Sequence, residues 1–215
     1  MFNKTETEHK VAEFLLQIKA IKLQPNNPFT WASGWKSPIY CDNRVTLSHP
    51  TIRTYIRQQL TQLIQDEFGS VGCIAGVATA GIPQGVLVAQ ELGLPFAYVR
   101  AKAKEHGTGS LIEGEIKTGE RIVVIEDLIS TGKSSLQAVE ALRAAGHDVA
   151  GLAAIFTYGF DIADEAFKQA KCRFVTLSNY NALLKCAEDG QYILPDDVEL
   201  LKAWREDPAA WGKQA

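Results

Sequence analysis

The stretch that decides the fold, residues 121–135, reads RIVVIEDLISTGKSS. Its first part, Ile122 to Ile125, is apolar and β-branched throughout, which is typical of a parallel strand covered on both faces. Glu126 and Asp127 follow where we expect that strand to end. A turn of small and hydroxyl side chains comes next and leads into a predicted helix over residues 136–145. The stretch therefore predicts a strand, two acids, a turn and a helix in immediate succession.

The turn over residues 130–135 has the composition of an anion site. It offers backbone N–H groups, several hydroxyls and the cation of Lys133 at the start of a helix. A helix N-terminus with unpaired N–H groups binds anions, most naturally a phosphate. Two carboxylates at a strand end suit the hydroxyls of a sugar, or a metal ion. Together these residues predict a pocket for a sugar phosphate.

The tripeptide Gly132-Lys133-Ser134 also ends the P-loop motif of nucleotide triphosphatases. That motif requires a glycine at position 127, where this chain has Asp127. The acids precede the turn here, so a triphosphate P-loop is disfavoured. The order fits a ligand whose ribose faces the acids while its 5′-phosphate lies in the turn.

Composition predicts an ordinary soluble protein. The 215 residues suffice for one large domain or a domain with a small annex. The content of 46% hydrophobic and 22% charged residues is typical of a globular protein and excludes a disordered chain. A net charge of −3 argues against a general nucleic-acid surface. The four cysteines are widely spaced without a CxxC pair, which favours free thiols in a reducing compartment. With no signal peptide or membrane-spanning run, we expect a cytoplasmic protein without a membrane partner.

Strands and helices alternate along most of the chain, which predicts a doubly wound α/β domain with a mostly parallel sheet flanked by helices. The predicted strands are residues 73–77, 96–99, 112–116, 121–125, 149–157 and 173–176. The predicted helices are residues 8–22, 50–68, 82–92, 136–145, 162–170, 179–188 and 196–205. We expect strand 112–116 to pair with strand 121–125.

Two segments fall outside this alternation. Residues 29–44, FTWASGWKSPIYCDNR, predict a small hairpin outside the main sheet. We expect residues 1–48, with part of the C-terminal tail, to form a hood over the strand ends. Residues 100–114, RAKAKEHGTGSLIEG, are polar, basic at the start and rich in glycine. Loops of that length in a compact domain are usually functional, so we expect a flexible catalytic loop.

These motifs together resemble a known family. IVVIEDLISTGKS is similar to the phosphoribosyl-pyrophosphate (PRPP) signature of type I phosphoribosyltransferases, and residues 29–44 and 100–114 resemble two segments of the orotate phosphoribosyltransferases. The resemblance spans roughly the whole chain. It implies transfer of the 5-phosphoribosyl group from PRPP to orotate in pyrimidine biosynthesis, giving orotidine 5′-monophosphate and pyrophosphate. It also implies Mg²⁺ as cofactor and a homodimer in which each catalytic loop reaches the partner's site.

The resemblance assigns roles residue by residue. Glu126 and Asp127 would bind the ribose hydroxyls, with Asp127 also reaching Mg²⁺ through water. The 5′-phosphate would be wrapped by Leu128, Ile129, Ser130, Thr131, Gly132, Lys133 and Ser134. The pyrophosphate would be approached by the loop residues Ala78, Thr79, Ala80 and Gly81. Arg100, Lys104 and His106 would bind PRPP by closing on its pyrophosphate. These three residues and Asp127 would be the catalytic residues. The orotate pocket would include Lys36, Tyr40, Arg44 and Ser130.

The chain departs from the family pattern at several positions. Ala101 stands where many relatives carry a second cation, so either Lys102 takes that role or the role is absent. Alanines also replace substrate-contacting lysines of some members at positions 32 and 80. Tyr158 and Gly159 follow the strand where some members place an arginine on the orotate carboxylate. Arg44 is the nearest local candidate for that contact.

Other interpretations compete at this point. The acid pair could simply cap a helix, and the charged loop could be a solvated surface. Phe29, Trp31 and Tyr40 could belong to the hood core or stack on a base. A purine phosphoribosyltransferase would share the PRPP signature, although residues 29–44 speak against it. A PRPP-sensing regulator would keep the fold without catalysis, but it would need a nucleic-acid-binding element, and none is visible in this acidic chain.

Overall fold

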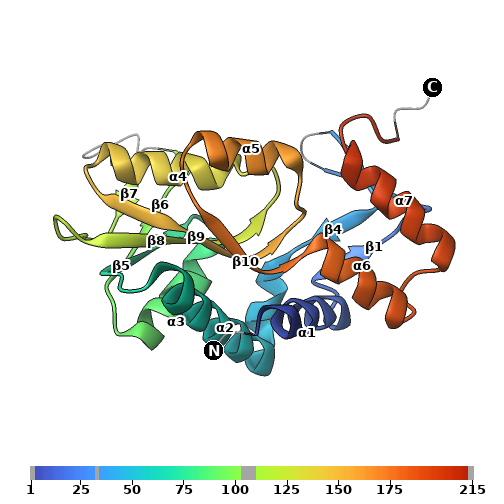
Figure 1. Cartoon of the computed structure of the whole chain (residues 1–215), viewed down its shortest axis with the longest axis horizontal. Coiled ribbons are helices and arrows are strands. Elements are labelled where there is room, and N and C mark those ends of the chain that lie inside the picture. The colour runs from blue at the N-terminus through green and yellow to red at the C-terminus, as the bar shows by residue number, and fades with distance from the viewer. Residues whose placement is uncertain (1–2, 32–33, 103–109, 213–215) are drawn as a thin grey trace.

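The structure, a computed structural model, describes residues 3–31, 34–102 and 110–212. Its centre is a six-stranded sheet in the order β10–β9–β8–β5–β6–β7 (Figure 1). These strands are β5 (Cys73–Val77), β6 (Phe96–Val99), β7 (Ile112–Glu113), β8 (Arg121–Ile129), β9 (Asp148–Thr157) and β10 (Phe174–Asn179). All neighbours pair in parallel except the short edge strand β7, which is antiparallel to β6. The predicted doubly wound, mostly parallel sheet is confirmed.

Helices cover both faces of the sheet (Figure 1). One face carries α1 (Lys4–Gln17), α2 (Pro50–Phe68) and α3 (Gly81–Leu92), and the other carries α4 (Lys133–Ala144) and α5 (Asp161–Gln169). Strand β8 shows why its sequence is uninterruptedly apolar. Val123 and Ile125 join one buried cluster, whereas Ile122 and Val124 join the other. Because both faces of β8 are buried, both sets of side chains are hydrophobic.

Gly81 lets α3 lie directly against β8. A Cβ at this position would meet the backbone oxygen of Ile125 at 2.4 Å, which is a clash. Any larger residue would therefore push the start of α3 away from the strand. The close approach places the N-terminal end of α3 beside the point where Glu126 begins the polar part of β8.

The small strands outside the main sheet and the C-terminal helices lie together at one end of the molecule (Figure 1). Strand β1 (Ile21–Leu23) pairs with β4 (Ile39–Cys41), and β2 (Phe29–Thr30) pairs with β3 (Lys36–Ser37), so the predicted hairpin outside the main sheet is confirmed. A 3-10 helix, η1 (Asn43–Ser48), follows β4. Helices α6 (Tyr180–Asp189) and α7 (Pro195–Glu206) complete this end.

Trp204 ties α7 to the hairpin. Its side chain is fully buried, its ring lies 5.6 Å from that of Trp31, and its Nε1–H donates to the backbone oxygen of Lys36 at 3.3 Å. On the adjacent helix, Tyr180 donates its hydroxyl proton to the oxygen of Leu201. The last helix is therefore packed against the hairpin through aromatic rings.

Four sequence predictions need correction. The first helix ends at Gln17 rather than at residue 22, because Ile21 lies in β1. Residues 112–116 were expected to pair with 121–125, but β7 pairs with β6, since β8 already has β5 on one side and β9 on the other. Strand β8 continues to Ile129, so the two acids lie within it, and α4 begins at Lys133 rather than at residue 136.

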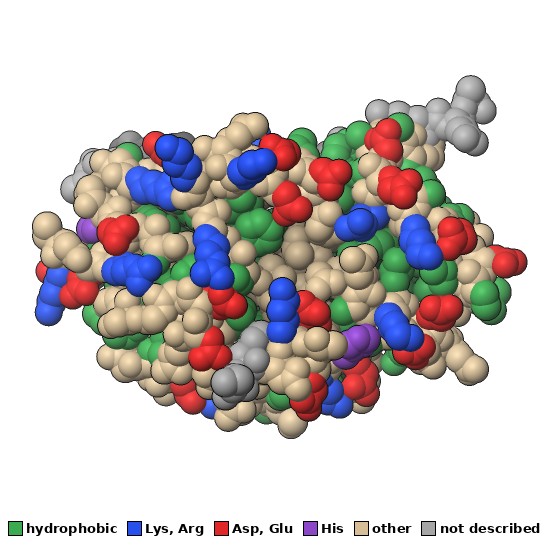
Figure 2. Space-filling view, viewed as in Figure 1, with side chains coloured by type: hydrophobic (Ala, Val, Ile, Leu, Met, Phe, Trp, Pro, Cys, Tyr) green, Lys and Arg blue, Asp and Glu red, His purple; other side chains and the backbone are tan. Residues whose placement is uncertain are grey.

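The surface carries mixed charge. Lysine and arginine are interspersed with aspartate and glutamate on the face shown in Figure 2. Among the described helices, none has the length and apolar character needed to cross a membrane. All four cysteines are free thiols, as predicted, and Cys73 and Cys172 are buried.

Candidate active site

The site begins where β8 loses one of its neighbours. The register of β5 on β8 ends at the pair Gly76 and Ile125, whereas β9 follows β8 as far as Ile129. The residues after Ile125 therefore have a strand on one side only. In an open parallel sheet, ligands bind outside the carboxyl ends of the strands, and this is such an end.

Glu126 and Asp127 occupy this position. Glu126 is 5% exposed, and its carboxylate accepts hydrogen bonds from the Asp127 N–H at 3.1 Å and from Ser135 Oγ at 3.3 Å. Burial, and then the adjacent charge of Asp127, raise the pKa of Glu126 well above its usual range. Burial also raises the pKa of Asp127. Two desolvated carboxylates side by side favour a ligand that donates hydrogen bonds, such as a sugar diol.

The acids do not cap the helix that follows. Gly132 is the N-cap of α4, and no side chain caps that helix in the described part of the chain. The helix-capping interpretation of the acid pair is therefore wrong. Gly132 has φ +77°, and a Cβ there would lie 2.7 Å from a ring carbon of Phe167, so both the turn and the packing require glycine.

The start of α4 is open to an anion. The first intrahelical bond runs from the N–H of Leu136 to the oxygen of Gly132 at 2.9 Å, so the N–H groups of residues 133–135 have no acceptor within the helix. Lys133 and Ser134 are exposed. Thr131 and Ser130 are half-buried in the same turn. Uncapped N–H groups, hydroxyls and a lysine form the arrangement in which proteins bind phosphate.

Two further predicted elements meet this turn. Ala78, Arg100 and Ser134 line a small pocket of about 20 Å³, together with Val77, Val99, Ala101, Gln137 and Ala138. The predicted pyrophosphate loop and the start of the predicted catalytic loop thus lie beside the phosphate turn. The Ala78–Thr79 peptide bond in this loop is cis. The Arg100 guanidinium lies 3.5 Å from the carboxylate of Glu113.

The rest of the predicted catalytic loop is only partly described. Lys102 is exposed near the end of a described range. Lys104 and His106 lie outside the described residues. Their predicted roles stay predictions.

A cleft of about 360 Å³ opens beside the acids and the turn. It is lined by Thr30, Trp31, Tyr40, Cys41, Leu128, Ser130 and Tyr158, and we call these residues the base cleft. Its aromatic walls suit a flat ring. Tyr40 is 40% exposed and lines the cleft, although it also packs 5.6 Å from Phe29. Ser130 and Leu128 belong both to this cleft and to the predicted phosphate segment, so the two regions adjoin.

Sequence reasoning assigned no individual ligand role to Thr30, Cys41 or Tyr158, although residues 40–44 were expected to lie in the segment that lines the orotate pocket. The first two lie in the segment 29–44 that signalled a pocket, but short strands gave no indication of which side chains face it. Tyr158 is 2% exposed and lies 5.3 Å from Trp31 and 5.6 Å from Trp204. Burial raises the pKa of the Tyr158 hydroxyl well above its usual range, so it is a neutral donor.

The two predicted orotate cations lie outside the wall of the base cleft. Lys36 donates to Thr30 Oγ1 at 2.8 Å, which places its ammonium at the edge of the cleft. Arg44 forms a two-pronged ion pair with Asp42, at 2.7 and 2.8 Å. This pairing raises the pKa of Arg44 and lowers the pKa of Asp42. The Arg44 guanidinium is thus already engaged by a carboxylate.

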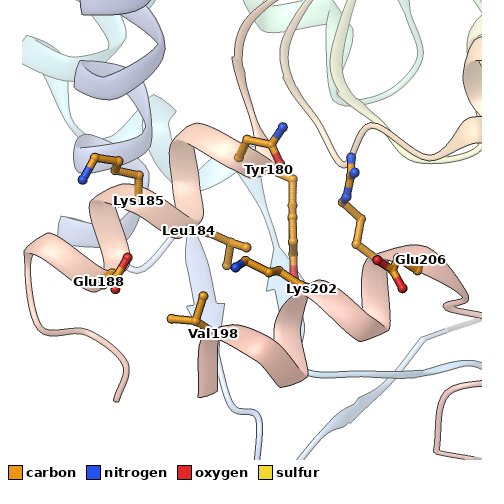
Figure 3. A pocket seen from close by; sticks show the side chains of 9 residues that line it. Tyr180, Leu184, Lys185, Glu188, Val198, Lys202 and Glu206 are labelled. Carbon is orange, nitrogen blue, oxygen red and sulfur yellow. The ribbon is translucent and has the colours of Figure 1, made fainter. Parts of the chain in front are cut away.

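A second hollow of about 380 Å³ lies between α6 and α7 (Figure 3). Its floor includes Tyr180, Leu184 and Val198. Lys185 is paired with Asp189 at 3.0 Å, and Lys202 with Glu199 at 2.8 Å. Both lysines are already paired with carboxylates, and the lining also contains Arg205 together with Glu188 and Glu206. The acidic side chains make the hollow a poorer phosphate site than the start of α4, and it contains none of the predicted site residues.

Comparison with known proteins decides the family. The model of the phosphoribosyl transferase domain matches residues 47–187. The chain is 59% identical over 204 residues to an orotate phosphoribosyltransferase of Phocaeicola vulgatus, covering 95% of this chain and 96% of that protein. The chain belongs to the orotate phosphoribosyltransferase family. The match to the orotate phosphoribosyltransferase from Phocaeicola extends over nearly the whole chain, as the sequence resemblance predicted.

Solved structures agree with this assignment. The orotate phosphoribosyltransferase of Aeropyrum pernix is 27% identical, with a TM-score of 0.74 over 86% of this chain and 99% of that chain. The Leishmania donovani UMP synthase is also 27% identical, with a TM-score of 0.79 over 92% of this chain, which spans 42% of that longer chain. The fold of this chain is therefore similar to that of a solved orotate phosphoribosyltransferase over most of its length.

Proposed function

We propose that this protein transfers the 5-phosphoribosyl group of PRPP to orotate, giving orotidine 5′-monophosphate and pyrophosphate in pyrimidine biosynthesis. One observation carries the proposal. The base cleft adjoins the acid pair and the open start of α4 through Ser130 and Leu128. A flat ring and a ribose phosphate would therefore lie next to each other. Family membership at 59% identity supports orotate as the ring.

The acid pair holds the ribose in this proposal. Glu126 and Asp127 accept hydrogen bonds from the 2′- and 3′-hydroxyls. The N–H groups and hydroxyls of the turn, from Leu128 to Ser134, surround the 5′-phosphate. Support comes from the burial of Glu126 and from the uncapped start of α4.

The reaction displaces pyrophosphate from C1 of the ribose while a ring nitrogen of orotate attacks. Positive charge develops on the sugar and negative charge leaves on the pyrophosphate. Neighbouring carboxylates stabilise the first, and Arg100, Lys104 and His106 stabilise the second. Fixing both reactants at the carboxyl end of β8 supplies much of the remaining acceleration. Closure of the loop 100–114 keeps water from the activated sugar.

Magnesium enters this proposal with PRPP. Among the described residues no group of three or more histidine, cysteine, aspartate or glutamate side chains could hold a metal ion. A donor set of two carboxylates fits an ion that is held mainly by substrate phosphates, which is the usual mode for Mg²⁺. Asp127 would contact the ion through water. When bound, the ion offsets the negative charge of the leaving pyrophosphate.

Two assembly features complete the proposal. The hood, residues 1–48 with part of the C-terminal tail, encloses the base, and the contact of Trp204 with Trp31 supports this.

The enzyme works as a cytoplasmic homodimer whose loops 100–114 reach into the partner's site. Mixing a Lys104→Ala variant with an Asp127→Asn variant tests the shared loop. Restored activity in the mixture supports sharing, and no recovery above the separate variants refutes it.

The activity itself is tested by the loss of orotate and the appearance of pyrophosphate with PRPP and Mg²⁺. We expect turnover with orotate and none with guanine, hypoxanthine or adenine. Asp127→Asn should lower kcat/KM by about a hundredfold, as expected for an electrostatic contact at the reacting sugar. Asp189→Asn, which alters an exposed aspartate paired with Lys185, is the matched control. Turnover of a purine, or of no base at all, would refute the assignment.

A further inference from the structure

Asn43 lies between the base cleft and the acid pair. It is the first residue of η1 and is only 1% exposed. Its Nδ2 donates to the backbone oxygen of Asp127 at 2.7 Å. Its Oδ1 accepts from the thiol of Cys41 at 3.4 Å, and Cys41 lines the base cleft. One amide therefore contacts both regions in which the substrates are proposed to bind.

Two buried side chains support Asn43 from behind. Thr46 Oγ1 donates to the backbone oxygen of Asn43 at 2.6 Å, and Gln84 Nε2 donates to Thr46 Oγ1 at 3.2 Å. Thr46 is 0% and Gln84 2% exposed. Gln84 lies on α3, the helix that begins at the end of the predicted pyrophosphate loop. The chain of bonds thus runs from α3 through η1 to the polar end of β8.

The direction of each bond is fixed. A backbone oxygen can only accept, so Asn43 must present its NH₂ group to Asp127 and its oxygen to Cys41. Thr46 gives its proton to Asn43 and can then accept from Gln84. Such a chain has one arrangement, and buried networks of this kind hold their members in a unique geometry.

Stability of the core does not explain Gln84. Its Oε1 is buried and has no partner among the described residues. A buried acceptor without a donor costs free energy, so an apolar side chain of similar length would be cheaper there. What the glutamine contributes is the bond to Thr46, and through it the position of Asn43.

We propose that Asn43 is a positioning residue for phosphoribosyl transfer, held in place by Thr46 and Gln84. This proposal rests on the proposed function. Asn43 fixes the backbone at Asp127, and so the direction of the ribose-binding carboxylate, relative to the wall of the base cleft. The attacking ring and the ribose are then aligned by one side chain that touches neither of them.

Asn43→Asp tests the donor specifically. The variant has the same shape, but an ionised carboxylate would face the oxygen of Asp127, which cannot donate. The charged and titratable groups nearest this position are Cys41, Asp42 and Asp127. The groups that interact electrostatically with these three or with one another are Lys22, Tyr40, Arg44, Glu126 and Tyr158. At about pH 8.5 we expect kcat/KM for PRPP to fall by about tenfold or more. Burial of this position beside the carboxylates of Glu126 and Asp127 should raise the pKa of the new carboxyl group above its usual range. The ratio of variant to wild-type kcat/KM, taken at each pH, should therefore recover as the pH falls to about 6, because the protonated carboxyl donates again.

Asn43→Ala and Gln84→Leu give the remaining arms. Both should raise the KM for orotate and for PRPP together, with the larger effect from Asn43→Ala. Asn179→Ala removes an asparagine whose Oδ1 accepts from Ala182 at the start of α6, and it is the matched control for lost stability. Circular dichroism and urea unfolding identify any variant that does not fold. If Asn43→Ala or Gln84→Leu does not fold, calorimetric binding of PRPP with Mg²⁺ to the Asn43→Asp protein decides the result.

The outcomes separate the two proposals. If the wild type turns over orotate but Asn43→Asp follows it at every pH, the positioning role is overturned and the proposed function stands. If the wild type does not use orotate but Asn43→Asp weakens PRPP binding with the stated pH dependence, the proposed function fails and the positioning of the ribose acids is supported. Equal losses for Asn43→Asp and Asn179→Ala would overturn the positioning role.

Discussion

The packing of α7 behind the base cleft should control orotate more than PRPP. Trp204 is fully buried and surrounded by the rings of Trp31, Tyr158, Phe160 and Tyr180, at centroid distances of 5.6, 5.6, 5.4 and 5.7 Å. Trp31 and Tyr158 line the cleft, whereas Trp204 does not. A change at Trp204 therefore reaches the base through two wall residues. None of the four rings around Trp204 belongs to the phosphate turn at the start of α4.

The size of the effect follows from these contacts. Trp204→Ala would cost about 3–5 kcal/mol from lost packing, plus about 1 kcal/mol because the oxygen of Lys36 loses its donor. That is a large part of the roughly 5–15 kcal/mol by which domains are stable, so the alanine variant is too severe. Trp204→Phe keeps an aromatic ring and should lose about 1–2 kcal/mol. It is the variant to measure.

The assay pairs urea unfolding with steady-state kinetics for both substrates. We expect Trp204→Phe to raise the KM for orotate about threefold to tenfold and the KM for PRPP less than about twofold, because only the wall of the base cleft moves. Phe68→Leu, a change at a buried aromatic under β9 that lies against Gly151, is the control for general destabilisation. An equal rise in both KM values, or no rise with the expected loss of stability, would refute the reasoning.

Three further predictions follow. Glu126→Gln should lower turnover yet stabilise the ligand-free protein at neutral pH. Because the pKa of Glu126 is raised in the folded protein, the free energy of unfolding of the wild type falls as the pH rises from the usual value of 4.5 through the folded pKa. Urea unfolding measured across pH should show that the two proteins become equally stable in acid. Gly132→Ala should lower the free energy of unfolding by about 2 kcal/mol, because φ is +77° at this position and the ring of Phe167 leaves no room for a Cβ. The variant should also bind PRPP more weakly in calorimetry. Unchanged binding would argue against the turn as the phosphate site. Lys104→Ala and His106→Ala should each lower kcat by about a hundredfold with the fold intact by circular dichroism, and wild-type kcat in either would remove that residue from the mechanism.

Much of the fold could be predicted from local patterns. The helix 50–68 and the strands 73–77 and 96–99 were placed correctly, because buried strands and amphipathic helices carry strong periodicity. The short strand β7 was assigned the wrong neighbour, since pairing depends on which edge of the sheet is free and not on its own residues. The extension of β8 past Ile125 was missed for a similar reason. Its polar end is held by pairing with β9 alone.

The site shows the same division. The acids and the turn were recognisable because their chemistry is contiguous in sequence. Trp31, Cys41 and Tyr158 converge from separate elements, and only the folded chain brings them to one cleft. The bond from Asn43 to the backbone of Asp127 spans 84 positions, and no local pattern marks it. Contiguous binding groups are visible in sequence, whereas walls and supports built across the fold are not.

The central claim is that base and ribose phosphate meet at the carboxyl end of β8. A crystal structure with orotate, PRPP and Mg²⁺ bound tests it most directly. We predict the orotate ring between Tyr40 and Tyr158, with the ribose hydroxyls on Glu126 and Asp127 and the 5′-phosphate on the N–H groups at the start of α4. A ring bound in the hollow between α6 and α7, or a phosphate away from the start of α4, would contradict the account.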